Sequence, residues 1–356
     1  MTRFAIPYEA NDFPSTIPSL GRLSCSWPGL LRSATSLAGS TIGSSRSGLS
    51  WLPGVALEFA WRAALVGANL RQRRRGGQPL LQTSQYRALD PSEKSAVSFF
   101  LGQVSAKHFA DYLLNAPIFA RVDEAMKAAG LPLVGRRPDF YGWGPGVGVI
   151  AVEAKGRSGI WSNQTMQKAK KQAGDLPRVL GGGAHTAIAH MAYFERRHWK
   201  AWLLDPSPRR RQQDGPPLEA VLLAYYQPFA QLLEERGAGD ASNHNGVTYD
   251  MAELPEVDLR IGLRRDLHQA LLLPGRAYQE RGAMLRRSLD DSDLEPISQE
   301  HFAEQQLISV KQAAQLAEEE AETGRSTGAD GVMLQAGASW TSVAMSLEPP
   351  ERYSVE

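Results

Sequence analysis

Three charged side chains stand at a spacing that suits metal-assisted chemistry. Asp139 follows Pro138 at the start of one strand-like segment, and Glu153 and Lys155 end the next, with a glycine-rich turn between the two segments. A tight hairpin would bring all three to one sheet edge, and strand alternation puts Glu153 and Lys155 on the same face. Two carboxylates this close repel unless a cation lies between them, and oxygen ligands with open water positions suit Mg²⁺. The pattern therefore predicts a site that activates water and stabilises charge developing on a phosphate.

The same residues resemble the signature of the PD-(D/E)XK nuclease superfamily. The sequence reads Arg-Pro-Asp139, twelve residues, then Val-Glu153-Ala-Lys155-Gly, and the resemblance covers about a third of the chain. It implies an α/β fold with a restriction-endonuclease-like core, in the order helix, mixed β-sheet, helix, strands. It also implies that Asp139 and Glu153 bind Mg²⁺, for which Mn²⁺ can substitute, and that Lys155 assists the attacking water. The implied function is a metal-dependent nuclease acting on DNA, in restriction, repair or phage defence.

The resemblance points to further site residues. Family members often add an acid from the first helix, for which Glu93 and Glu58 are candidates, and a Gln or Lys from the helix after the second strand, for which Gln167 and Lys168 are candidates. Basic side chains nearby could contact nucleic acid, namely Lys171, Arg209, Arg210 and Arg211. For every one of these residues, an ordinary solvated surface group is the alternative interpretation.

Hydrophobic periodicity predicts the elements that position these residues. Helices are expected over 55–70, 92–114, 121–129 and 164–178, and strands over 137–143, 147–154, 185–194 and 199–204. The order is helix, strands, helix, strands, which is the order that the resemblance implies.

Three segments follow from this pattern. Residues 1–54 are rich in Ser, Gly and Pro after residue 12, so we expect an irregular, partly disordered leader. Residues 55–212 are expected to form the core domain that the resemblance implies. Residues 213–356 are expected to form a mainly helical extension, with helices over 218–236 and 298–323 and a hairpin over 331–347 that returns to the main sheet.

The chain of 356 residues has a formal net charge of only +1, yet this charge is unevenly distributed. Residues 151–212 carry twelve Lys or Arg against four acids, whereas residues 290–322 carry ten acids against one Lys. A polyanion would bind the first region and avoid the second. The acidic region could instead serve a protein partner or cover the basic site as a polyanion mimic, and a homodimer is also open.

Composition bears on the cellular compartment and on membrane association. The single cysteine, Cys25, excludes an internal disulfide framework, and we find neither a secretory signal nor an apolar run long enough to span a bilayer. These features predict a cytoplasmic protein without a membrane partner. The alternative to an active nuclease is a nuclease-fold protein without turnover that acts as a nucleic-acid-binding or protein-interaction module.

Overall fold

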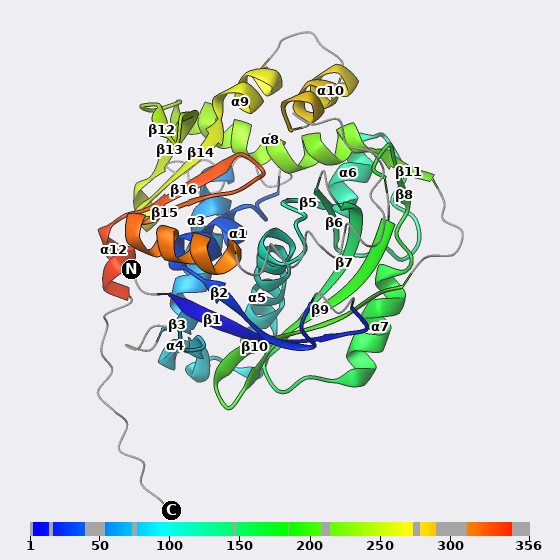
Figure 1. Cartoon of the computed structure of the whole chain (residues 1–356), viewed down its shortest axis with the longest axis vertical. Helices are drawn as coiled ribbons and strands as arrows, with labels where there is room; N and C mark the ends of the chain where they lie inside the picture. Colours follow the sequence, from blue (N-terminus) through cyan, green and yellow to red (C-terminus); the bar gives the residue numbers. More distant parts are fainter. Residues whose placement is uncertain are drawn as a thin grey trace, which may run out of the picture.

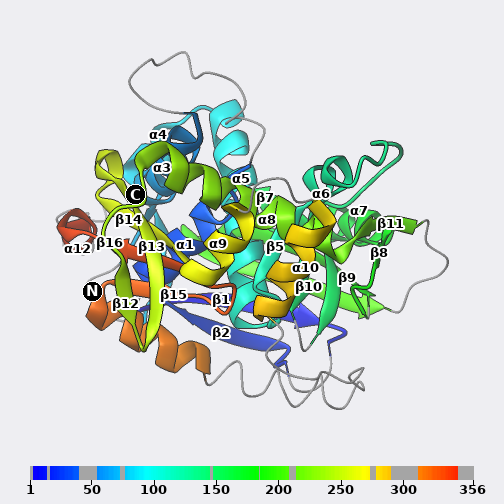
Figure 2. The ribbon, with the colours of Figure 1, turned by 90° about the horizontal axis from the view of Figure 1, so that it is seen from above.

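The computed structural model shows a mixed α/β protein with two main β-sheets (Figures 1 and 2). It describes residues 3–13, 17–39, 54–72, 77–144, 147–183, 185–207, 214–272, 278–289 and 312–343. Within these ranges, no helix is long and apolar enough to cross a membrane. The prediction of an α/β fold is confirmed.

The larger sheet carries the hairpin of the predicted site. Its main path runs β2 (Leu20–Cys25), β1 (Phe4–Asn11), β10 (His198–Ser207), β9 (His185–Glu195), β7 (Gly148–Arg157), β6 (Phe140–Gly144) and β5 (Ile118–Arg121). Two short strands, β3 (Leu70–Arg71) and β4 (Leu81–Gln82), attach beside β10. The pairs β7–β9 and β1–β10 are parallel, and the other pairs along the path are antiparallel.

Two helices pack on opposite faces of this sheet. Helix α5 (Pro91–Tyr112) contacts β9 through Ser105 and Phe109, which both lie against His190. Helix α7 (Asn163–Ala173) covers the other face, where Met166 clusters with Met191 of β9. The predicted helices and strands between residues 55 and 206 are confirmed, although α7 ends near Gly174 because Pro177 disfavours helix before it. The sequence analysis missed the short strand β5.

The N-terminal prediction was wrong for the described part of the leader. Strand β1 inserts into the main sheet beside β10, β2 pairs with it, and α1 (Trp27–Thr35) is buried along its whole length. Trp27 and Leu30 belong to the principal hydrophobic core. The pairing that orders this segment joins residues almost two hundred positions apart, so local composition could not reveal it.

The C-terminal extension is also different from the prediction, because it contains a second sheet. This sheet is antiparallel and runs β12 (Ser242–His244), β13 (Val247–Leu254), β14 (Leu259–Arg264), β16 (Val332–Ala336) and β15 (Arg325–Thr327). Strand β16 therefore completes this second sheet and does not return to the main one, and residues 338–343 form helix α12 (Ala338–Val343). The predicted helix over 218–236 is confirmed as α8 (Leu218–Arg236).

The remaining elements connect these layers. They are α3 (Gly54–Asn69), α4 (Ser84–Ala88), α6 (Val122–Ala128), β8 (Arg178–Leu180), β11 (Asp214–Pro217), the 3₁₀ turn η1 (Pro255–Val257), α9 (Arg265–Leu272) and α10 (Tyr278–Leu289).

A helix over 312–323 is the described part of the predicted acidic helix. Its buried side chains recur every four residues, at Ala313, Ala317 and Ala321, so one face packs on the core. Glu320 is 4% exposed and accepts hydrogen bonds from Ser26 and Tyr112. This part of the helix is therefore integrated into the fold through one face, while Glu318, Glu319 and Glu322 are exposed. In both views it lies far from α7 (Figures 1 and 2).

A buried network of charges ties the two ends of the chain to the core. Arg32 of α1 pairs with Asp111 of α5 and with Asp330 before β16, and Lys107 also pairs with both aspartates. Tyr225 of α8 donates a hydrogen bond to Asp330. Each charge has partners of opposite sign, which is what makes burial of such groups tolerable.

Candidate active site

The β6–β7 hairpin brings Asp139 and Glu153 together as the spacing predicted. Phe140 pairs with Val152 in the antiparallel register, so Asp139 lies across from Glu153 at the open end of the hairpin. The Oδ2 atom of Asp139 accepts a hydrogen bond from the backbone N–H of Ala154 at 2.9 Å. This bond fixes the aspartate beside the neighbouring strand.

Glu153 and Lys155 share the face of the sheet that α7 covers. In the parallel register, Lys155 lies beside Met191, which packs with Met166 of α7. Ala154 lies beside His190, which contacts α5 on the opposite face. The strand alternation expected from the sequence is therefore confirmed.

Glu153 is completely buried and only partly satisfied. Its Oε1 atom forms an ion pair with Lys155, whose side chain is 31% exposed. Its Oε2 atom is buried and accepts no hydrogen bond of good geometry among the described residues, although Asp139 lies close enough to interact with the Glu153 carboxyl group. Burial, followed by the charge of Asp139, raises the pKa of Glu153 from 4.5 to about 7.

The pKa of Asp139 is also raised. Burial raises its pKa, while the hydrogen bond from Ala154 and the charges of Lys155 and Arg121 oppose this rise. Two carboxylates in one partly dry site titrate as a pair, so the two protons are lost in linked steps.

These residues fit a divalent cation. The Oε2 atom of Glu153 could serve as an oxygen ligand, and a cation would offset the burial and the repulsion by Asp139 that together raise the pKa of Glu153. Mg²⁺ is commonly held by one or two carboxylates together with waters and substrate phosphate. Within the described ranges, no group of three or more His, Cys, Asp or Glu side chains could hold a metal, so a third acid does not join the pair.

Close packing of α5 on β7 sets the position of this strand. A Cβ atom on Gly156 would lie 1.6 Å from the carbonyl oxygen of Ser98, and one on Gly102 would lie 2.6 Å from the carbonyl oxygen of Lys155. Only glycine permits this approach of helix and strand backbones. The sequence analysis overlooked both glycines, although Gly156 directly follows Lys155.

On α7, the candidate residues separate onto different faces. Thr165 accepts a hydrogen bond from Arg157 of β7, and Gln172 donates one to the carbonyl of Arg137 before β6. These contacts define the stripe of α7 that faces the hairpin. Lys168 lies next to this stripe at helical spacing, and its own side chain is exposed. Gln167 and Lys171 are exposed on the side turned away from it.

The other candidates do not join the carboxylates. Glu93 is exposed and accepts the N–H of Asp90 in a capping box at the start of α5. Glu58 pairs with Arg62 within α3. Arg209, Arg210 and Arg211 lie outside the described residues.

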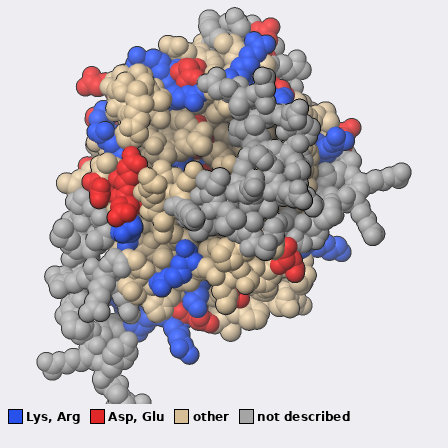
Figure 3. All heavy atoms as spheres, in the orientation of Figure 1, with Lys and Arg blue, Asp and Glu red and all other residues tan. Residues whose placement is uncertain are grey.

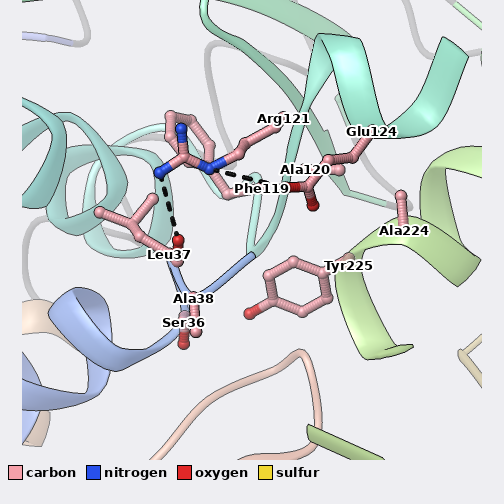
Figure 4. A pocket seen from close by; sticks show the side chains of 9 residues that line it. All are labelled: Ser36, Leu37, Ala38, Phe119, Ala120, Arg121, Glu124, Ala224 and Tyr225. Atoms are coloured by element: carbon pink, nitrogen blue, oxygen red, sulfur yellow. Dashed lines mark hydrogen bonds and ion pairs between the residues drawn. The ribbon is translucent and has the colours of Figure 1, made fainter. Parts of the chain in front are cut away.

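A separate hollow lies on the other face of the sheet (Figure 4). Residues 36–38, Glu124 and Tyr225 line it, together with Arg121, whose guanidinium group donates to the carbonyl of Leu37. Arg121 stacks over Phe140, which is on the opposite side of β6 from Asp139. The sheet therefore separates this hollow from the carboxylates.

Cys25, His108 and Ser33 form a second cluster of reactive types. The Sγ atom of Cys25 lies 2.6 Å from Nε2 of His108, and Ser33 contacts Nδ1 at 3.0 Å. Burial raises the pKa of the Cys25 thiol and lowers the pKa of His108 to about 3. The neutral, sealed pair cannot act as a nucleophile toward a solute.

Comparison of the chain with protein-family models, curated proteins and solved structures returned no match. On the face that Figure 3 shows, Lys and Arg are interspersed with Asp and Glu and do not form one continuous patch.

Proposed function

We propose that this protein is a divalent-metal-dependent nuclease that hydrolyses phosphodiester bonds of DNA, with a restriction-endonuclease-like core. The observation that carries the proposal is the placement of Asp139, Glu153 and Lys155 on one face of the β6–β7 hairpin, with a buried oxygen of Glu153 that accepts no hydrogen bond of good geometry among the described residues. Perturbed carboxyl groups next to a lysine are typical of catalytic sites.

Each residue has a distinct role in this proposal. Asp139 and Glu153 would hold the cation, which when bound would act as a Lewis acid and order a water molecule. Lys155 would leave Glu153 and place its ammonium group beside the charge that develops on the phosphate. Lys168, next to the facing stripe of α7, would contact a neighbouring phosphate.

One contact favours the alternative of a nuclease-fold module without turnover. The ion pair between Lys155 and Glu153 neutralises the site without any metal, which is what a purely structural pair would do. The two hypotheses differ in whether removal of Lys155 affects cleavage or only stability.

Cleavage of supercoiled plasmid and single-stranded DNA, with Mg²⁺, Mn²⁺ or EDTA, tests the proposal. We expect metal-dependent cutting that Asp139→Ala abolishes and that Lys155→Ala lowers about 10²- to 10³-fold. The matched control is Lys200→Ala, which breaks a comparable Lys–Glu pair with Glu195 on the same sheet and should cut normally. No cutting with any metal, together with salt-sensitive DNA binding that both site variants retain, would instead establish the binding module.

A further inference from the structure

The loop between β7 and α7 exposes two large apolar side chains beside the candidate site. Ile160 is 65% exposed and Trp161 is 44% exposed, and both lie between Arg157, the last residue of β7, and Asn163, the first residue of α7. Exposure alone does not mark a site, because Leu133 and Val134 form another exposed neighbouring pair in this protein. Ile160 and Trp161, however, lie in the loop that directly follows the strand of Glu153 and Lys155.

Trp161 is held in place and is not a loose surface group. Its ring packs edge to face against Trp202 of β10, with ring centroids 5.1 Å apart. Trp202 is 7% exposed and belongs to the cluster under α7 that includes Met166 and Met191. An anchored, half-exposed indole is preorganised for stacking, because little side-chain freedom is lost on binding.

The sheet register links this indole to the candidate site. Lys155 lies beside Met191, and Met191 lies beside Trp202, so the three form one row across β7, β9 and β10 on the same face. Two strand spacings amount to roughly 10 Å. Met191, in the middle of this row, is fully buried under Met166 of α7, so a substrate strand could not follow the row itself and would pass outside α7.

Two basic side chains lie on β7 between the candidate carboxylates and the loop that carries Trp161. Lys155 and Arg157 project from the same face of β7 as Glu153, and the guanidinium group of Arg157 is oriented by Thr165 at 3.1 Å. A cationic track beside an exposed aromatic ring is the combination by which proteins bind single strands without reading their sequence. Bases inside a duplex are already stacked, so only an unpaired base could use Trp161.

We propose that Trp161, supported by Trp202, is a stacking platform for an unpaired base of the substrate strand. The proposal rests on the proposed nuclease function of Asp139, Glu153 and Lys155, and it names the substrate class as DNA with a single-stranded segment. Arg157 holds a phosphate between the platform and the metal-binding carboxylates.

Equilibrium binding in EDTA to a labelled single-stranded oligodeoxynucleotide, and to its blunt duplex, tests the platform without cleavage. Trp161→Ala should weaken single-strand binding about 5- to 150-fold and leave duplex binding unchanged, whereas Trp161→Phe should retain most of the affinity. The matched control is Trp61→Ala, because Trp61 is also exposed (40%) and packed edge to face on another ring, but it lies on α3. Thermal unfolding of each variant shows whether a loss reflects folding, and Trp161→Phe keeps the test valid if the alanine variant unfolds.

The outcomes separate this inference from the proposed function. If wild-type protein cuts DNA but Trp161→Ala binds single strands normally, the platform is wrong and the nuclease stands. If Trp161 is needed for single-strand binding but wild-type protein cuts nothing, the platform stands and the nuclease is wrong. If Trp161→Ala alters self-association in sedimentation and not DNA affinity, the loop is an interface between copies and the platform is wrong.

Discussion

Replacing Glu153 by Gln should stabilise the metal-free protein at alkaline pH and not at acidic pH. Burial and the adjacent Asp139 raise the pKa of Glu153 from 4.5 to about 7, so the folded protein keeps a proton that the unfolded chain has already lost between these values. Stability therefore falls as pH rises from about 4.5 to 7, and the full penalty is present above pH 7. A rise of about 2.5 pKa units corresponds to roughly 3 kcal/mol.

Denaturant unfolding of wild-type and Glu153→Gln protein in EDTA, at pH 5 and pH 8, measures this penalty. We expect little difference at pH 5 and a gain approaching 3 kcal/mol for the variant at pH 8. The matched control is Glu195→Gln, which removes another Glu–Lys pair of the same sheet. The hydrogen bond and charge of Lys200 lower the pKa of Glu195, so its ionised form is favoured by folding and its loss should slightly destabilise at neutral pH.

Added Mg²⁺ at pH 8 should make the wild-type protein more stable to denaturant than the Glu153→Gln variant. A cation that binds ionised Glu153 stabilises the wild-type protein, and this stabilisation should grow as pH rises through 7 because fewer protons must be displaced. Mg²⁺ should stabilise the Glu153→Gln variant much less. If Glu153→Gln were equally destabilising at both pH values, the carboxyl group would be a favourable structural charge and the reasoning from burial and repulsion would be refuted.

Three further outcomes follow from packing. Gly156→Ala should destabilise by several kcal/mol in thermal unfolding, because its Cβ would overlap the backbone of α5, whereas Gly159→Ala, whose Cβ meets nothing within 4 Å, should be close to neutral. Arg32→Met should lower the free energy of unfolding by about 3–5 kcal/mol, because it removes a cation that neutralises two buried aspartates. Arg3→Met breaks an exposed ion pair and should lower it by less than about 1 kcal/mol in the same denaturation assay. Cys25 is 1% exposed and its thiol pKa is raised, so labelling by a thiol reagent should follow global unfolding; fast labelling of the native protein would contradict the sealed cluster.

The site could be predicted from sequence because its signals are local. Asp139, Glu153 and Lys155 lie on two consecutive strands joined by a short turn, so alternation and turn chemistry suffice to place them. The supporting residues were harder to assign. Glu93 was taken as a candidate ligand, but in the structure it caps the start of α5.

The fold outside the central region depends on contacts that local patterns do not contain. Strand β1 is ordered by β10, and α1 is buried although its segment looks like a polar leader, because Arg32 is neutralised by Asp111 and Asp330 from distant parts of the chain. The short strands of the second sheet likewise pair across a long insertion between β14 and β16. Such pairings are visible only once the partner segments are known.

Two sets of buried carboxylates in this protein show how a structural charge differs from a candidate functional one. Asp330 accepts hydrogen bonds from Arg32, Tyr225 and a backbone N–H, and its partners leave the folded protein without an unmatched oxygen there. Glu153 is just as buried, yet one oxygen accepts no hydrogen bond of good geometry among the described residues. Glu58 also leaves one buried oxygen without a partner, but its other oxygen accepts hydrogen bonds from Arg62 and a backbone N–H. Glu153 differs because a second carboxylate lies beside it, which makes its burial more costly. The cost becomes understandable if the missing partner is a cation that arrives with the substrate strand.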